Sequence, residues 1–285
     1  MPATMFRPRP ADLPDFERPP VNEVVLSLQF ASLPFRNIHA GLLWERLKSK
    51  FAKVEEHHPI DPAFETFGVP QAIQGMPQFQ MLSQFPPSRF WFITADDQHL
   101  LQVQGDRLIH NWRKRSPGDQ YPRYEQLRER FEREVALVQE YWQIECIGTI
   151  AVNQCEVTYI NQIQLAGGGD PTKKLEEIFT IWSGQSSDAF LTHEAERGNF
   201  GISYILKDSA NAPYGRLHVT ATPVIHRETN EPFVQLTLVA RGRPSDALVS
   251  TAFGWFDHGR DTIVRAFASL TQPQMHRLWG RKNVN

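Results

Sequence analysis

Hydrophobic and polar positions follow the same order twice along this chain, first over roughly residues 23–142 and again over roughly 153–271. Each set begins with an apolar strand and a helix, continues with strands separated by polar turn residues, and closes with a long helix. An order that recurs in this way is typical of an internal duplication. The pattern predicts two tandem β-α-β(n)-α units over residues 21–145 and 146–285, preceded by a flexible, proline-rich arm over residues 1–20.

The first unit begins with an apolar strand over residues 23–30, followed by a helix with one apolar stripe. The stripe recurs at spacings of three and four residues and consists of Ile38, Leu42, Leu43, Leu47, Phe51 and Val54. We expect His57, His58 and Pro59 to end this helix. Residues 59–87 are rich in proline and lack a sustained period, which predicts a long ordered loop.

From Arg89 onward, apolar residues alternate with turn residues, and this alternation predicts three strands joined as hairpins. A helix over about 123–142 closes the first unit, with apolar residues on one face and mixed arginine and glutamate on the other. The second unit opens with a strand over 153–165. Two faces alternate along it, one with Cys155, Val157, Tyr159, Asn161 and Ile163, the other with Glu156, Thr158, Ile160 and Gln162.

The rest of the second unit predicts a short helix near residues 175–182, three strands and a closing helical region. We expect the strands over 200–206, 217–225 and 233–240, and helices over 245–270 and near 275–279. Together the elements predict an α+β fold in which helices cover one face of an antiparallel sheet. Their order resembles the pseudo-twofold saddle of TATA-binding-protein-like folds.

The composition is that of a globular chain, since 41% of the 285 residues are hydrophobic and can fill a large core. A formal charge of -2 provides no overall attraction to nucleic acid or to an anionic membrane. Two cysteines, Cys146 and Cys155, are too few for a disulfide scaffold. The N-terminal residues lack the apolar core of a secretory signal, and no apolar run approaches the roughly 20 residues of a membrane span. We therefore expect a cytoplasmic protein without membrane association.

Five segments of the chain carry a likeness to known sequences: PPVNEVVLSLQF, LLQVQGDRLIHNWRK, YPRYEQLRERF, CEVTYINQI and VRAFASLTQPQMHRLWG. Together they resemble a sporadically distributed bacterial family of uncharacterised proteins, and the resemblance covers most of the chain from Pro19 to Gly280. That family brings no established activity, cofactor or catalytic residue. Its patchy distribution implies an accessory system such as phage defence or a toxin–antitoxin pair.

No segment has the residue types and spacing of a known catalytic, cofactor or metal motif. His57 and His58 follow two glutamates, but no distant ligand set matches them, which favours a solvated helix end. Cys155 lies in the middle of a strand, where we expect a packed and unreactive thiol. We predict no catalytic residue, no cofactor and no metal ligand. This pattern leaves enzyme activity open but favours a protein without it.

Polar side chains gather on the strand that opens the second unit and on the hairpin of the first. One explanation is a polar network buried between the two halves, because buried polar groups need partners. The alternative is an open groove that binds a peptide or small ligand through Asn111, Arg113, Glu156, Tyr159 and Asn161. A small-ligand sensor or enzyme of this kind would need a cavity of about 300 Å³ or more beside these residues.

The leading hypothesis is a non-enzymatic binding or scaffold protein that holds a partner protein or forms a homodimer. It assigns the contact to the junction of the two units and to the proline-rich loop, through Phe64, Phe67, Phe79, Phe85, Trp112 and Arg123. Nucleic-acid binding is a further alternative, because the run HNWRKR at 110–115 and the following arginines form a local basic patch. Glutamates alternate with those helix arginines, which favours an ion-paired surface instead.

Overall fold

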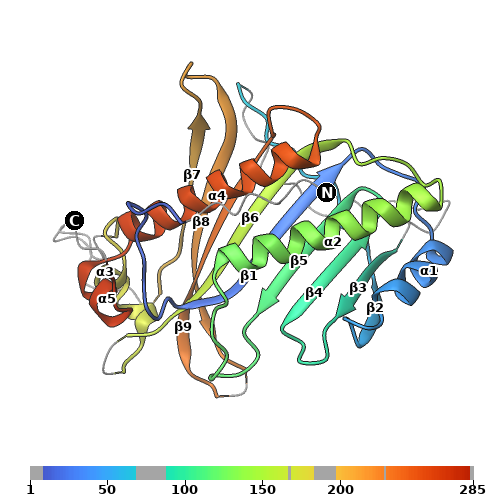
Figure 1. The fold of residues 1–285 in the computed structure, drawn as a ribbon. Helices are drawn as coiled ribbons and strands as arrows, with labels where there is room; N and C mark the ends of the chain where they lie inside the picture. Colours follow the sequence, from blue (N-terminus) through green and yellow to red (C-terminus); the bar gives the residue numbers. More distant parts are fainter. Residues whose placement is uncertain (1–8, 69–87, 166–167, 183–196, 228, 283–285) are drawn as a thin grey trace, which may run out of the picture.

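The computed structural model describes residues 9–68, 88–165, 168–182, 197–227 and 229–282 (Figure 1). Within these ranges the strands are β1 (Val21–Phe30), β2 (Lys53–His57), β3 (Arg89–Ile93), β4 (His99–Gln104), β5 (Arg107–Arg113), β6 (Val152–Ile163), β7 (Phe200–Lys207), β8 (Pro213–Ile225) and β9 (Pro232–Gly242). The helices are α1 (Asn37–Leu47), α2 (Tyr124–Ile144), α3 (Leu175–Ile178), α4 (Val249–Leu270) and α5 (Pro273–Leu278), with a 3-10 turn, η1 (Pro171–Lys173), before α3.

The nine described strands form one antiparallel sheet in the order β2-β3-β4-β5-β1-β6-β9-β8-β7. β1 and β6, which open the two predicted units, pair with each other near the middle of the sheet. The other strands of each half lie on their own side of this central pair. The predicted α+β fold with an antiparallel sheet is therefore confirmed, and the described strands of both halves belong to a single continuous sheet.

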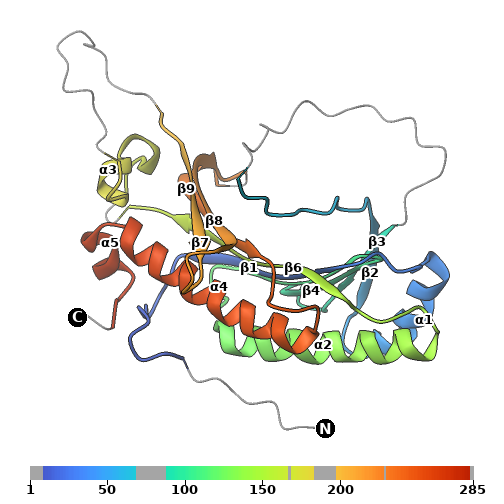
Figure 2. The same ribbon diagram turned by 90° about the horizontal axis from the view of Figure 1, so that it is seen from above.

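Alternation along β1 separates the two faces of the sheet. Leu26, Leu28 and Phe30 are at most 1% exposed and lie in the apolar core, whereas Ser27 and Gln29 between them point the other way. Figure 2 shows α1, α2 and α4 on the same side of the sheet and residues 58–68 on the opposite side. We call the first side the helix face. The second side is the strap face, and residues 58–68 are the strap segment.

Aromatic side chains fill the layer between the sheet and the two long helices. Phe131 on α2 lies 5.9 Å, ring centre to ring centre, from both Phe253 and Phe256 on α4. Burial of each such ring contributes roughly 1.5–3 kcal/mol to folding. A polar contact fixes the same helix pair, because the Tyr124 hydroxyl donates to an Asp257 carboxylate oxygen at 2.8 Å.

Helices α2 and α4 are long, at 21 and 22 residues, but each carries ionisable side chains along its length. Their apolar stripes face the sheet and their polar sides face outward or toward each other. Among the residues that the structure describes, no helix has both the length and the apolar character needed to cross a membrane.

The first helix is shorter than the sequence pattern predicted. It ends at Leu47, and Lys53–His57 forms the edge strand β2. Ile38 and Leu42, placed in the predicted stripe, are 70% and 47% exposed. The prediction failed because Val54 continues the helical spacing by chance, whereas antiparallel pairing with Phe92 on β3 places it in the sheet.

Residues 9–20, predicted to be part of a flexible arm, pack along the C-terminal helices. Leu13 is fully buried, and the Phe16 ring lies 5.4 Å from Phe267 and 6.2 Å from Trp279. Asp12 forms an ion pair with Arg265 on α4. Leu13 and Phe16 therefore anchor this part of the proline-rich segment in the core, while residues 1–8 lie outside the described ranges.

The close approach of β8 and β9 depends on a pair of opposed glycines. A Cβ atom on Gly242 would lie 2.5 Å from the Tyr214 carbonyl oxygen and 2.8 Å from the Gly215 Cα. We expect Gly242→Ala to lower the free energy of unfolding by about 1–3 kcal/mol, since backbone atoms must shift. The matched control is Gly201→Ala on edge strand β7, where a Cβ meets nothing within 4 Å and the change should stay within about 0.5 kcal/mol. Urea unfolding measures both, and equal effects would contradict the packing argument.

Candidate functional site

The strap face carries a row of polar side chains that runs across four adjacent strands. Strand register aligns Gln104 on β4, Arg107 on β5, Gln29 on β1 and Gln154 on β6. Each of the four is at most 8% exposed. Because buried polar groups require hydrogen-bond partners, this row needs an element that covers it and supplies donors and acceptors.

The strap segment follows this row from β4 to β6. It lies on the side of the sheet opposite the long helices (Figure 2). Gln104 accepts from the Ile60 backbone N–H at 2.8 Å and donates to the Ile60 carbonyl at 2.9 Å. Arg107 donates to the Asp61 carbonyl at 3.0 Å. These bonds attach the start of the strap segment to β4 and β5.

The middle of the strap segment is bound by the two central strands. The Ala63 backbone N–H donates to Gln29 at 2.9 Å. The Glu65 backbone N–H donates to the Gln154 side-chain oxygen at 2.8 Å when that amide is oriented to satisfy both of its neighbours. Side chains of the sheet therefore bind main-chain atoms of the strap segment, an arrangement that depends little on which side chains the strap carries.

Glu65 anchors the far end of the strap segment by its carboxylate, whose side chain is 2% exposed. It accepts from His218 Nε2 at 2.8 Å, forms an ion pair with Arg216, and lies 3.4 Å from Arg241 Nη1. Arg216 also donates to the Thr66 carbonyl at 3.1 Å. We call Glu65, Arg216, His218 and Arg241 the Glu65 cluster.

The charges of the Glu65 cluster favour an ionised carboxylate. Burial raises the pKa of Glu65, but donation by His218 and the positive charges of His218, Arg216 and Arg241 outweigh it, and the pKa lies below its ordinary value. A buried carboxylate with this many cationic partners is stable only while those partners remain, because an unpaired buried charge is costly. Any group that replaces Glu65 must therefore also be an anion.

Ser203 on β7 extends the cluster, since its Oγ lies 2.9 Å from His218 Nδ1. When the hydroxyl donates to Nδ1, the imidazole proton resides on Nε2 and is donated to Glu65. Serine, histidine and carboxylate in this order are also the components of nucleophilic catalysis. Ser203 lies within a strand rather than on the tight turn that presents a nucleophile, and Glu65 is already neutralised by arginines. The arrangement is therefore suited to holding a carboxylate.

The five predicted ligand-binding residues do not converge on one pocket. Asn111, Arg113 and Glu156 lie on the strap face, whereas Tyr159 and Asn161 lie on the helix face. Alternation along β6 separates Glu156 from the other two, as the sequence pattern itself predicted for that strand. Glu156 instead accepts from Arg241 Nε at 2.6 Å, beside the Glu65 cluster.

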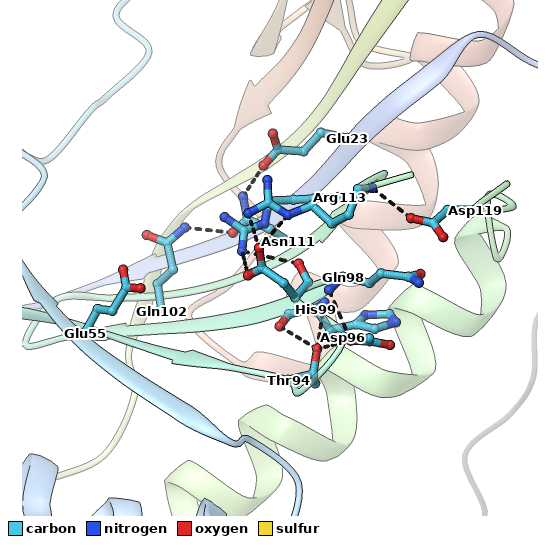
Figure 3. A network of polar contacts seen from close by, with 12 residues as sticks. Glu23, Glu55, Thr94, Asp96, Gln98, His99, Gln102, Asn111, Arg113 and Asp119 are labelled. Carbon is cyan, nitrogen blue, oxygen red and sulfur yellow. Dashed lines mark hydrogen bonds and ion pairs between the residues drawn. The ribbon is translucent and has the colours of Figure 1, made fainter. Parts of the chain in front are cut away.

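Asn111 and Arg113 belong to a hydrogen-bonded network on the side of the sheet nearer β2 (Figure 3). Gln102 donates to Asn111 at 2.7 Å, and Asn111 donates to Glu23 on β1 at 2.6 Å. Arg113 donates to Asp97 in the β3–β4 turn at 2.7 Å. These bonds of Asn111 lie within the first half of the chain and not between the two halves, and they occupy its side-chain amide.

Tyr159 and Asn161 line a cavity of about 50 Å³ on the helix face. The Tyr159 and Tyr121 hydroxyls are 2.9 Å apart, and burial raises the pKa of Tyr159 to about 12. A second cavity of about 10 Å³, enough for one water molecule, lies beneath the strap segment. Both are far smaller than the roughly 300 Å³ expected of a small-ligand site.

The predicted partner-contact aromatics have different environments. Phe64 on the strap segment is 48% exposed. Phe67, also on the strap segment, packs against the Arg216 guanidinium, whose carbon lies 5.0 Å from the ring centre. Phe79 and Phe85 lie outside the described residues. Phe64 is therefore the described aromatic of this set that is available to a partner.

Trp112 and Arg123 are not positioned as the partner hypothesis expected. Trp112 is 1% exposed and lies in the core, so it cannot contact a partner at the surface. Arg123 forms an ion pair with Asp15 at 3.2 Å. Strand alternation turns Trp112 and Arg113 to opposite faces, so Trp112 does not lie beside Arg113 as the stacking aromatic of the basic run.

The helix face holds a chain of titratable groups that the sequence did not reveal. His110 is fully buried and its Nδ1 lies 2.7 Å from Glu134 on α2, while its Nε2 lies 3.3 Å from His99 Nδ1. Arg130 donates to the same Glu134 at 3.1 Å. Within the described ranges, no three histidine, cysteine or acidic side chains are grouped to hold a metal ion.

The sequence analysis did not single out any member of the Glu65 cluster, nor Ser203. The alternation of side chains along β8 places Arg216 and His218 on the same face. This alternation was the feature of the sequence from which their proximity could have been predicted. Glu65 lies about 150 residues earlier, in a segment without periodicity, so nothing in the sequence paired it with β8.

No protein-family model matches this chain, and a search of curated proteins found no match. The resemblance to the sporadically distributed bacterial family therefore stays a prediction.

The chain of titratable groups predicts how stability depends on pH. Burial, with the nearby charges of Arg130 and His110, lowers the pKa of His99 to about 4. Between about pH 6.5 and 4 the unfolded chain therefore binds a proton that the folded chain does not, so stability falls as pH falls. We expect a loss on the order of 1–2 kcal/mol, allowing for the partial exposure of His99.

Urea unfolding at pH 7, 6 and 5 measures this loss, and His99→Gln should make the dependence shallower. Glu134 acts in a different window: its pKa lies below the ordinary 4.5, so its contribution is present above that pH and is lost below it. The same pH dependence in wild type and His99→Gln would show that His99 is not the group responsible.

Proposed function

We propose that this chain is a non-enzymatic binding protein that holds a partner protein over the strap face of its sheet. One observation carries the proposal: the strap segment, an extended polypeptide, is bound across this face through main-chain atoms by Gln29, Gln104, Arg107 and Gln154. Because the side chains of the sheet bond to main-chain atoms, this surface is suited to binding an extended polypeptide. The two central strands, β1 and β6, lie directly beneath it.

The environment of Phe64 supports this proposal. The ring stands on the strap segment with 48% of its surface exposed, although the residues on both sides of it are attached to the sheet. Exposed aromatic rings on a positioned backbone are frequent anchors at protein interfaces. The buried thiol of Cys155, whose pKa burial raises far above its usual value, is a packing group and offers no competing nucleophile.

We also propose that the two halves arose by tandem duplication and form a pseudo-twofold saddle like that of TATA-binding-protein-like folds. The order of strands supports this: β1-β5-β4-β3 on one side of the centre corresponds to β6-β9-β8-β7 on the other. In chain order, a long helix follows the final strand of each half: α2 follows β5 and α4 follows β9. The central β1–β6 pair would then lie on the pseudo-twofold axis.

The proposal places the protein in the cytoplasm, where two unpaired cysteines are common, and in an accessory bacterial system, as the sequence resemblance implies. It gives less weight to the alternatives. The described cavities of about 50 and 10 Å³ are small for a ligand sensor or enzyme. Nucleic-acid binding through the α2 arginines competes with ion pairs, since Arg128 bonds to Asp257 and Arg130 to Glu134.

A photo-crosslinking experiment tests the proposal. The photoreactive residue p-benzoylphenylalanine replaces Phe64 in the full chain, and this protein is expressed in the native host. After irradiation, the crosslinked adducts are identified by mass spectrometry. We expect a specific protein adduct, because Phe64 lies on the strap segment with 48% of its surface exposed. The matched control carries the same group at Ile144, which is 54% exposed at the end of α2. No adduct at position 64, or the same adducts from both positions, would contradict the proposed interface.

A further inference from the structure

The strap segment indicates which feature of a bound polypeptide the strap face recognises. Most of its contacts are made to main-chain atoms at residues 60, 61, 63, 65 and 66. Neighbouring strap side chains, including those of Asp61, Phe64 and Thr66, are exposed. The side chain of Glu65, in contrast, is almost completely buried between two arginines, Arg216 and Arg241, and the His218 imidazole. The face therefore accepts an extended backbone and selects one acidic side chain.

The strap segment is attached more weakly than the elements around it. It forms no strand, and none of its residues belongs to the apolar core cluster. Segments with few buried apolar contacts open at a smaller free-energy cost than the fold as a whole. The strap segment can therefore leave the sheet without unfolding it.

Departure of the strap segment would leave a face rich in unneutralised arginine. Arg216 and His218 would lose their carboxylate partner, and Arg241 would keep only Glu156. On the same face of the sheet, Arg89 on β3 and Arg107 on β5 form no ion pair with any described residue. The Nε atom of each arginine also lacks a hydrogen-bond partner among the described residues. Burial and their mutual repulsion lower the pKa of Arg89. Such a face attracts acidic ligands.

We propose that the Glu65 cluster is a binding site for an acidic side chain on an extended segment of the partner protein, and that the strap segment occupies it when the partner is absent. This inference rests on the proposed function and adds the chemistry of the partner segment. Arg216, His218 and Arg241 receive the partner's carboxylate in place of Glu65. The row formed by Gln104, Arg107, Gln29 and Gln154 binds its main chain.

Peptide binding in trans tests this assignment. The probe is a fluorescent peptide with the strap sequence HPIDPAFETFG, residues 58–68, titrated into full-length wild type and into the Glu65→Ala variant. In wild type the chain's own strap competes with the peptide, whereas Glu65→Ala removes its anchor. We expect the variant to bind the peptide about tenfold more tightly or better, because a larger fraction of molecules has an empty site.

Two matched controls isolate the carboxylate. A peptide with glutamine at the position of Glu65 should bind Glu65→Ala roughly tenfold more weakly or worse, since it lacks the charge that Arg216 and Arg241 pair with. The variant Glu140→Ala removes an exposed carboxylate on α2, on the opposite side of the sheet, that forms no ion pair with any described residue, and it should behave as wild type. If Glu65→Ala does not fold, Glu65→Gln keeps the shape of the anchor, removes its charge, and takes its place.

The outcomes separate this inference from the function on which it rests. Equal affinity for the glutamate and glutamine peptides, or no binding to the variant, would overturn the carboxylate site. If crosslinking at Phe64 captures a partner protein while the peptides give one of these results, the partner contacts the strap segment in its sheet-bound position. The proposed function then stands, and only the acidic-segment assignment, in which the partner takes the strap's place, is lost. Tighter binding by Glu65→Ala that requires the peptide's glutamate supports the assignment directly.

Discussion

Antiparallel pairing of β1 with β6 joins the two halves of the chain, and the rest of the structure is arranged around it. The register places apolar residues such as Leu26 beside Val157 on the helix face, and polar residues such as Ser27 beside Glu156 on the strap face. Since every further strand pairs outward from this centre, its alternation extends across the sheet. A slip of one residue would exchange the two faces and expose the core.

The two faces are covered by different physical means. On the helix face, α2 and α4 bury aromatic rings, and the hydrophobic effect holds them there. On the strap face, polar side chains cannot be covered by an apolar layer, because each buried donor or acceptor needs a partner. An extended segment provides a backbone N–H and C=O at every non-proline residue, which is why the strap segment can satisfy this row. Its attachment is therefore polar and local, as the proposed exchange with a partner segment would require.

The arrangement also explains why the polar residues of this chain do not form a single pocket. Asn111 is buried on the strap face by hydrogen bonds, the partly exposed Glu156 is paired with Arg241, and Tyr159 and Asn161 face the helices. Buried polar groups of this kind give specificity to the fold by requiring particular neighbours. The Glu65 cluster differs from them because its carboxylate comes from a segment that is not part of the sheet.

The sequence by itself determined the class of fold, the alternation along β6 and the existence of two long amphipathic helices, because these depend on local periodicity of two or 3.6 residues. It did not determine β2, where pairing with β3 overrode a helical spacing that ended at Val54. Only the tertiary structure decided the path of the strap segment and the meeting of Glu65 with Arg216, His218 and Arg241. A residue in a segment without periodicity carries no mark of its distant partner, and charged groups from β8, β9 and the strap segment become neighbours only when the sheet is assembled.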